Sequence, residues 1–172
     1  SHIAQARSDS PLGPSTVAAT ARGLAGLWFD GQAHHPGTLD APIDETQCFI
    51  AQARSELDHY WRGTRKPFAV PLAAQGTPFQ QAVWRTLLDI SSGSTSTYAA
   101  VAAGAGSPRA VRAAGAAIGR NPLSIIVPCH RVLARDGSLT GYAGGLEKKI
   151  ALLGIEGIDV DALSMPKKGV AL

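Results

Sequence analysis

Residues 125–131, in the second half of the chain, consist of a short apolar run that leads through a proline into a cysteine with chemically active neighbours. A cysteine thiol has a pKa of about 8.5 and is only a few per cent thiolate near neutral pH, so a reactive cysteine needs a base or a positive field beside it. His130 and Arg131 directly follow the cysteine and are the residue types that supply both. Because neighbours in sequence need not point the same way, the residues alone make Cys129 a candidate nucleophile and leave open a buried, inert cysteine.

The other cysteine, Cys48, and the remaining histidines predict no second reactive cluster. The sequence has no CxxC pair, and no group of cysteines and histidines has the spacing of a four-ligand zinc site. His34, His35 and His59 stand apart from any cysteine pair and are expected to be surface or loop residues. We therefore expect free thiols, no metal and no cofactor.

Charge is distributed unevenly along the chain. Residues 1–76 have a net charge of −1, from six basic and seven acidic residues, whereas residues 77–172 have +4, from ten and six. No acidic residue occurs between Asp89 and Asp136. Such a stretch attracts a phosphate backbone, although a solvated basic face explains the charge equally well. Its arginines are Arg109, Arg112, Arg120, Arg131 and Arg135.

Composition favours a soluble globular protein, with 45% hydrophobic and 17% charged residues in a chain of 172. No apolar run approaches the roughly 20 residues of a membrane-spanning helix, and residues 1–10 lack the basic-then-apolar order of a secretory signal. We therefore expect a cytoplasmic protein with no membrane partner.

The pattern of apolar and turn residues predicts an α+β fold in two domains, a small mixed one at 1–76 and a mainly helical one at 77–172. In the first, β-prone runs at 15–20 and 23–30 flank a two-residue turn and predict a hairpin. Residues 68–72 are a possible third strand, which its prolines confine to a sheet edge.

A helix in the first domain is predicted to begin near Asp44, which can cap it with Gln47 three residues later. Cys48 lies beside its apolar stripe and is expected to serve in packing. The stripe consists of Phe49, Ala53, Leu57 and Tyr60.

The second domain follows a linker at 73–76. A capping threonine, a proline and a glutamine open a helix at 77–88. A short helix at 98–103, a glycine-bearing turn at 104–107 and a helix at 108–118 then suit a helix-turn-helix, although any pair of antiparallel helices looks similar. Two arginines lie on its second helix, Arg109 and Arg112.

Several segments around the candidate cysteine form one extended signature. Pro-Cys-His-Arg at 128–131 follows Asn-Pro at 121–122 and precedes Gly-Tyr-Ala-Gly-Gly-Leu at 141–146. This signature resembles the active site of the O6-alkylguanine-DNA alkyltransferases. The likeness covers residues 77–157 closely and the first domain loosely, and it implies a ribonuclease H-like fold for that first domain. Three more segments occur in the family's order, at 79–84, 97–98 and 109–115.

The resemblance implies that Cys129 attacks the alkyl carbon of O6-alkylguanine in line and becomes a thioether, so that each molecule acts once. It implies that His130 accepts the cysteine proton through a water and that Glu156 holds His130. From the residues alone, Glu156 is more simply a surface acid after a helix at 146–153.

Further roles are implied by the same resemblance. Asn121 would brace the active-site turn, and Tyr98 would crowd the flanking phosphate and protonate the departing guanine at N3. A stacked guanine cannot meet a thiolate, so the base must leave the duplex. The substrate pocket would include Val127, Pro128, Tyr142 and Ala143.

The implied partner is double-stranded DNA carrying alkylated guanine. Arg112 would enter the stack from the minor groove and fill the space left by the base, and Arg109 would meet phosphate. We expect a monomer when free, with possible cooperative assembly on DNA. Small residues would permit close approach to the groove, namely Ala110, Ala113, Ala114 and Ala117.

Other interpretations stay open beside this one. A protein that flips alkylguanine without transferring the alkyl group would lack the acceptor, which the presence of Cys129 disfavours. A helix-turn-helix regulator should have a sensor or dimer domain, and a cysteine hydrolase would turn over many times. Ala143 replaces a serine found in many family members, which leaves substrate range and rate open. The sequence also leaves open the preference between O6-alkylguanine and O4-alkylthymine.

Overall fold

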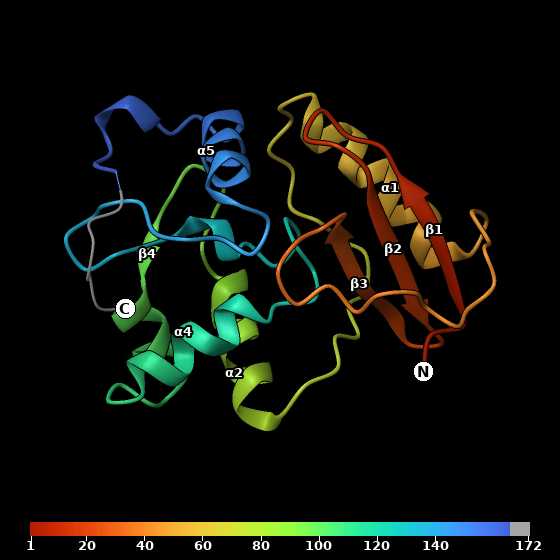
Figure 1. Cartoon of the computed structure of the whole chain (residues 1–172), viewed down its shortest axis with the longest axis horizontal. Coiled ribbons are helices and arrows are strands. Elements are labelled where there is room, and N and C mark those ends of the chain that lie inside the picture. Colours follow the sequence, from red (N-terminus) through yellow and green to blue (C-terminus); the bar gives the residue numbers. More distant parts are fainter. Residues whose placement is uncertain (166–172) are drawn as a thin grey trace. The chain divides into compact units, whose positions relative to one another are not determined.

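The computed structural model describes residues 1–165, so the end of the predicted second domain, at 166–172, lies outside the described residues. The chain forms two compact units. The first contains Ser1–Gln75 and also Pro122–Ser124, and the second contains Gly76–Asn121 and continues from Ile125. The fold is α+β as predicted, with a small antiparallel sheet and a helix in the first unit and mainly helices in the second (Figure 1).

The first unit has a three-stranded antiparallel sheet in the order β1-β2-β3. The predicted hairpin forms as β2 (Ser15–Thr20) and β3 (Gly23–Phe29), with every residue of both strands buried. The sequence analysis missed β1 (Ala4–Ser8). Its inward residues are alanine and serine, so alternation along the strand leaves only a weak hydrophobic signal.

Helix α1 (Cys48–Trp61) begins at Cys48 rather than near Asp44. The side chain of Gln47 caps it by accepting hydrogen bonds from two backbone N–H groups, while Asp44 accepts from Thr46 in a separate turn. The predicted apolar stripe is buried except that Ile50 takes the place of Phe49, and Cys48 is exposed rather than packed.

Two irregular segments pair with β3. Residues 68–72 form no strand, and their contact with β3 is a single bridge between Leu24 and Leu72, because the prolines cannot donate to a ladder. Pro122–Ser124 also pairs with β3: Leu27 N donates to Pro122 O at 2.8 Å, and Ser124 N donates to Leu27 O at 3.1 Å. This pairing accounts for the place of Pro122–Ser124 in the first unit.

In the second unit, α2 begins with the predicted capping box, in which Thr77 and Gln80 each accept from the other's backbone N–H. Helix α4 begins at Val111 and not at 108, since the preceding residues turn through a bond from Ala110 N to Ser107 O. The Trp84 indole donates to Ala117 O at 2.9 Å and so ties α2 to α4. The elements are α2 (Pro78–Leu88), β4 (Ser96–Thr97), α3 (Tyr98–Gly104), α4 (Val111–Gly119), η1 (Cys129–Arg131), β5 (Val132–Leu133), α5 (Leu146–Ile155) and η2 (Val160–Ala162).

Candidate active site

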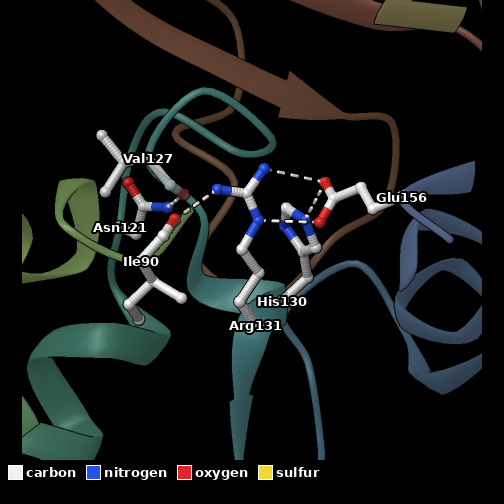
Figure 2. A network of polar contacts seen from close by, with 6 residues as sticks. All are labelled: Ile90, Asn121, Val127, His130, Arg131 and Glu156. Carbon is white, nitrogen blue, oxygen red and sulfur yellow. Dashed lines mark hydrogen bonds and ion pairs between the residues drawn. The ribbon is translucent and has the colours of Figure 1, made fainter. Parts of the chain in front are cut away.

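Cys129 opens the short 3-10 helix η1, and only 6% of its surface is exposed. Asn121 holds the turn from one side: its Nδ2 donates to Val127 O at 2.8 Å, drawn in Figure 2, and to the Cys129 Sγ at 3.2 Å. Ile125 leads into the turn with φ +73°, a conformation that β-branched residues avoid. The turn is therefore fixed by tertiary contacts rather than by local preference.

Two opposing effects set the acidity of the Cys129 thiol. Burial raises its pKa, while the hydrogen bond from Asn121 and the positive charge of Lys149 lower it. Burial is the larger effect, so the thiol is held protonated and needs a base to become a thiolate.

His130, the residue after Cys129, forms a buried pair with Glu156. His130 Nε2 lies 2.7 Å from Glu156 Oε2, with both side chains buried (Figure 2). Arg131 Nε and Nη2 donate to the two oxygens of the same carboxylate at 2.7 and 3.0 Å, and Arg131 Nη1 donates to Ile90 O. Glu156 is thus no surface acid but the centre of a buried network.

Burial of this network favours a neutral histidine. Burial alone would raise the pKa of Glu156, but the hydrogen bonds from His130 and Arg131 outweigh it and lower that pKa to about 2. Burial lowers the pKa of His130 more than Glu156 raises it. A neutral His130 donates Nε2–H to the carboxylate and keeps Nδ1 as an acceptor. This Nδ1 is buried and has no hydrogen-bond partner among the described residues, so it is available to take a proton.

A second polar group packs on another side of the site. The Lys149 ammonium, fully buried on α5, donates to Val132 O at 2.6 Å and to Thr140 Oγ1 at 3.1 Å. Thr140 Oγ1 also lies 2.8 Å from the Tyr98 hydroxyl. Burial lowers the pKa of Lys149 to about 8, and the negative charge of Cys129 acts in the opposite direction.

The helix-turn-helix forms from α3 and α4 of the second unit. Arg109 lies in the turn before α4 and Arg112 lies in its first turn, and both are exposed, as is Ala113. Ala114 and Ala117 face the interior with 0% and 3% exposure. Ala114 and Ala117 were expected to permit close approach to the groove by their small size, and their own surfaces are already covered by protein in this conformation.

Comparison with known proteins places the chain. Two family models match: the 6-O-methylguanine DNA methyltransferase ribonuclease-like domain over residues 4–74, and its DNA-binding domain over residues 78–158. A methylated-DNA--protein-cysteine methyltransferase of Methanosarcina barkeri is 43% identical, with 86% of this chain and 93% of the relative aligned, and one of Mycobacterium leprae is 44% identical, with 86% and 88% aligned. The chain belongs to the 6-O-methylguanine DNA methyltransferase family. The crystal structure of Mycobacterium tuberculosis OGT in complex with DNA matches at a TM-score of 0.84 and 41% identity, covering 90% of this chain and 93% of that one.

Around the cysteine of this methyltransferase-family chain, the structure brings together Asn121, His130 and Glu156. Val127 and Pro128 are buried beside it, and Tyr142 and Ala143 are half-buried. Val127 was expected in the substrate pocket, and its backbone oxygen already accepts hydrogen bonds from the Asn121 amide and from the Cys129 N–H. Both lone pairs of that carbonyl are used in this conformation.

Lys149 and Thr140 are absent from the residues that the sequence analysis assigned to this methyltransferase-family site. The burial of Lys149 could have been predicted from the sequence. Lys149 shares one helical face with Leu146 and Leu153, and a lysine on an apolar stripe indicates a buried ammonium. Arg131 was counted with the arginines that attract phosphate, but it is buried and bound to Glu156. Nothing in the spacing of Thr140 indicates its contacts.

Within residues 1–165 of this methyltransferase-family chain, no helix has both the length and the apolar character needed to cross a bilayer. Within the same residues, no three His, Cys, Asp or Glu side chains gather where they could bind a metal ion.

Proposed function

We propose that this protein repairs duplex DNA by moving an alkyl group from O6 of guanine to Cys129, once per molecule. The observation that carries the proposal is the 2.7 Å contact between His130 and the Glu156 carboxylate, which leaves His130 Nδ1 as a buried acceptor next in sequence to a buried cysteine. A nucleophile, a base and a group that orients the base are the parts that activation of a thiol requires.

The proposed reaction begins when His130 Nδ1 takes the thiol proton through a bridging water. The Glu156 carboxylate stabilises the imidazolium that results, because the two groups lie in a buried, low-dielectric site. The thiolate then forms a sulfur–carbon bond as the bond from the alkyl carbon to O6 breaks. Tyr98 protonates the leaving guanine at N3. The thioether product has no ready hydrolysis, so Cys129 is not regenerated.

Access to the base is proposed to follow from the exposed start of α4. Arg112 would occupy the stack after the guanine leaves it, with α4 in the minor groove, and Arg109 would contact phosphate. This assignment is supported by the exposure of both arginines and of Ala113, which follows Arg112 on α4. The similarity to an OGT solved in complex with DNA supports DNA as the partner.

One experiment tests the proposal directly. Duplex DNA with radiolabelled O6-methylguanine is incubated with the wild type, with Cys129→Ser and with the matched control Cys48→Ser, and the labelled peptide is identified. We expect one label per molecule on the Cys129 peptide of the wild type and of Cys48→Ser. Cys129→Ser should retain DNA binding and take up none, because a hydroxyl is far less nucleophilic than a thiolate. Label in Cys129→Ser, or more than one turnover per wild-type molecule, contradicts the proposal.

A further inference from the structure

Lys149, Thr140 and Tyr98 form a connected row of polar groups within the second unit that the proposed reaction uses only at its end. Lys149 Nζ lies 3.1 Å from Thr140 Oγ1, and that oxygen lies 2.8 Å from the Tyr98 hydroxyl. Lys149 is fully buried, and Thr140 and Tyr98 are 8% and 6% exposed. The three groups are therefore largely shielded from solvent.

The chemistry of the three groups gives the row a direction. An ammonium can only donate, so Thr140 Oγ1 accepts from Lys149. The Thr140 hydrogen is then available for the Tyr98 oxygen, and the phenol hydrogen of Tyr98 is available for a base. Each group donates to the next, from the ammonium outward.

We propose that Thr140 is a positioning residue that passes the Lys149 proton to Tyr98 while Tyr98 protonates the departing guanine, an inference that rests on the proposed function. As the thiolate bonds to the alkyl carbon and the carbon–O6 bond breaks, the electron pair goes to guanine. Tyr98 gives its proton to guanine N3, Thr140 gives its proton to the phenolate, and Lys149 gives one to Thr140. The products are a thioether, a neutral guanine and a neutral amine, so the charges of the thiolate and the ammonium cancel.

Burial explains why Lys149 would release its proton at this step. No carboxylate of residues 1–165 lies within ion-pair distance of Lys149, so once His130 has taken the thiol proton, the Cys129 thiolate is the negative charge that offsets Lys149. Alkylation makes the sulfur neutral, and an uncompensated buried ammonium is strongly disfavoured. His130 is the other titratable group that senses the Lys149 charge, and its positive form, generated in the preceding step, also favours loss of the Lys149 proton.

Two substitutions at one position test the inference. Thr140→Val removes the hydroxyl and keeps the shape, and Thr140→Ser restores a hydroxyl. We expect Thr140→Val to slow transfer from O6-methylguanine duplex DNA by about tenfold, less than the roughly hundredfold loss of a complete general acid because Tyr98 remains, and Thr140→Ser to recover most of that loss. The matched control is Thr86→Val on α2. The Thr86 hydroxyl donates to Ala82 O and has no part in this row, so the rate of alkyl transfer should not change in this variant.

A second reagent separates proton transfer from a structural role. Iodoacetamide alkylates Cys129 with iodide as the leaving group, and iodide needs no proton. The rate of this alkylation against pH should therefore be the same in Thr140→Val and in the wild type. Equal slowing with both reagents, or an unchanged rate with DNA, overturns the role of Thr140. A wild type that places no alkyl group on Cys129 from DNA overturns the proposed function itself, and this inference with it.

Discussion

At the scale of single residues, the buried Lys149 makes a prediction about stability. The pKa of Lys149 in the folded protein is about 8, below its ordinary value of 10.5. Below pH 8 the ammonium is charged in both states, and its burial makes that charge less favourable in the folded state than in the unfolded state. By linkage, stability should rise between pH 8 and 10.5, by up to about 3 kcal/mol. Lys149→Met should flatten this rise and increase the free energy of unfolding at pH 7 by about 1 kcal/mol.

Urea unfolding at several pH values measures this effect, with Lys148→Met on the same helix as the control. A Lys149→Met protein that is less stable than the wild type at pH 7 would mean that the hydrogen bonds of the ammonium outweigh its burial.

Glu156 makes the opposite prediction at acid pH. Its folded pKa of about 2 lies below the ordinary 4.5, so its ionised form stabilises the fold above pH 4.5, and this contribution is lost as pH falls from 4.5 to 2. The loss is on the order of 3 kcal/mol. Glu156→Gln cannot titrate, so its stability should change less across that window. Thermal unfolding should distinguish it from the control Glu147→Gln, an exposed position on α5, which should follow the wild type.

Residue types and spacing made Cys129 a candidate nucleophile but did not indicate its surroundings. Cys129 was readable because a thiol beside His130 is a local pattern. The contact of His130 with Glu156 joins residues 26 positions apart, and only the family resemblance implied it. Lys149 and Thr140 come into contact only through the packing of α5, and no sequence pattern indicates the contacts of Thr140.

At the scale of elements, α4 gives a prediction that separates base flipping from charge attraction. Under the proposed function, Arg112→Ala loses the group that opposes re-stacking of the base, which is worth a few kcal/mol, so transfer from duplex DNA should fall about a hundredfold. Free O6-benzylguanine needs no flipping, and its reaction with Cys129 should stay nearly unchanged. Arg112→Lys should rescue duplex repair only in part, because an ammonium cannot stack as a guanidinium does.

The control for this prediction is Arg120→Ala, an exposed arginine at the other end of α4. Comparable losses with duplex and free base in Arg112→Ala would indicate damage to α4 itself, and full rescue by lysine would reduce Arg112 to a phosphate contact.

Helix starts show why element boundaries were predictable in one case and not in others. At α2 the sequence holds a complete capping box with proline at its first position, and the helix begins there. At α1 the short side chain of Asp44 was the better statistical cap, yet Gln47 performs this function. At α4 no side chain caps the helix at all, so its start at Val111 is set by the turn before it.

At the scale of the whole molecule, basic charge predicts how DNA binding depends on salt. Four of the five arginines in the acid-free stretch are exposed, since Arg131 is bound to Glu156. The logarithm of the association constant for DNA should fall linearly with the logarithm of the salt concentration, because lysines and arginines that bind phosphate displace counterions. Arg109→Ala should reduce the slope by about 1, whereas Arg22→Ala in the first unit should not. A slope near zero in the wild type would remove the electrostatic argument.

The first unit includes one segment that composition and turn residues do not indicate. Pro122–Ser124 lies in sequence between Asn121 and the cysteine turn, and no local pattern separates it from them. Its two hydrogen bonds with Leu27 connect positions about a hundred residues apart. Pairing over such a separation depends on the folded sheet, and no local period reports it.

The bond from the Trp84 indole to Ala117 O has an optical consequence. Trp84 is 4% exposed, and its ring N–H donates a hydrogen bond to α4, the helix that contains Arg112. Indole emission depends on the hydrogen bond and the polarity around the ring, so a shift of α4 would change the colour and intensity of the light that Trp84 emits. With Trp28 and Trp61 replaced by phenylalanine, the protein would report the movement of its own α4 by fluorescence, without an added dye.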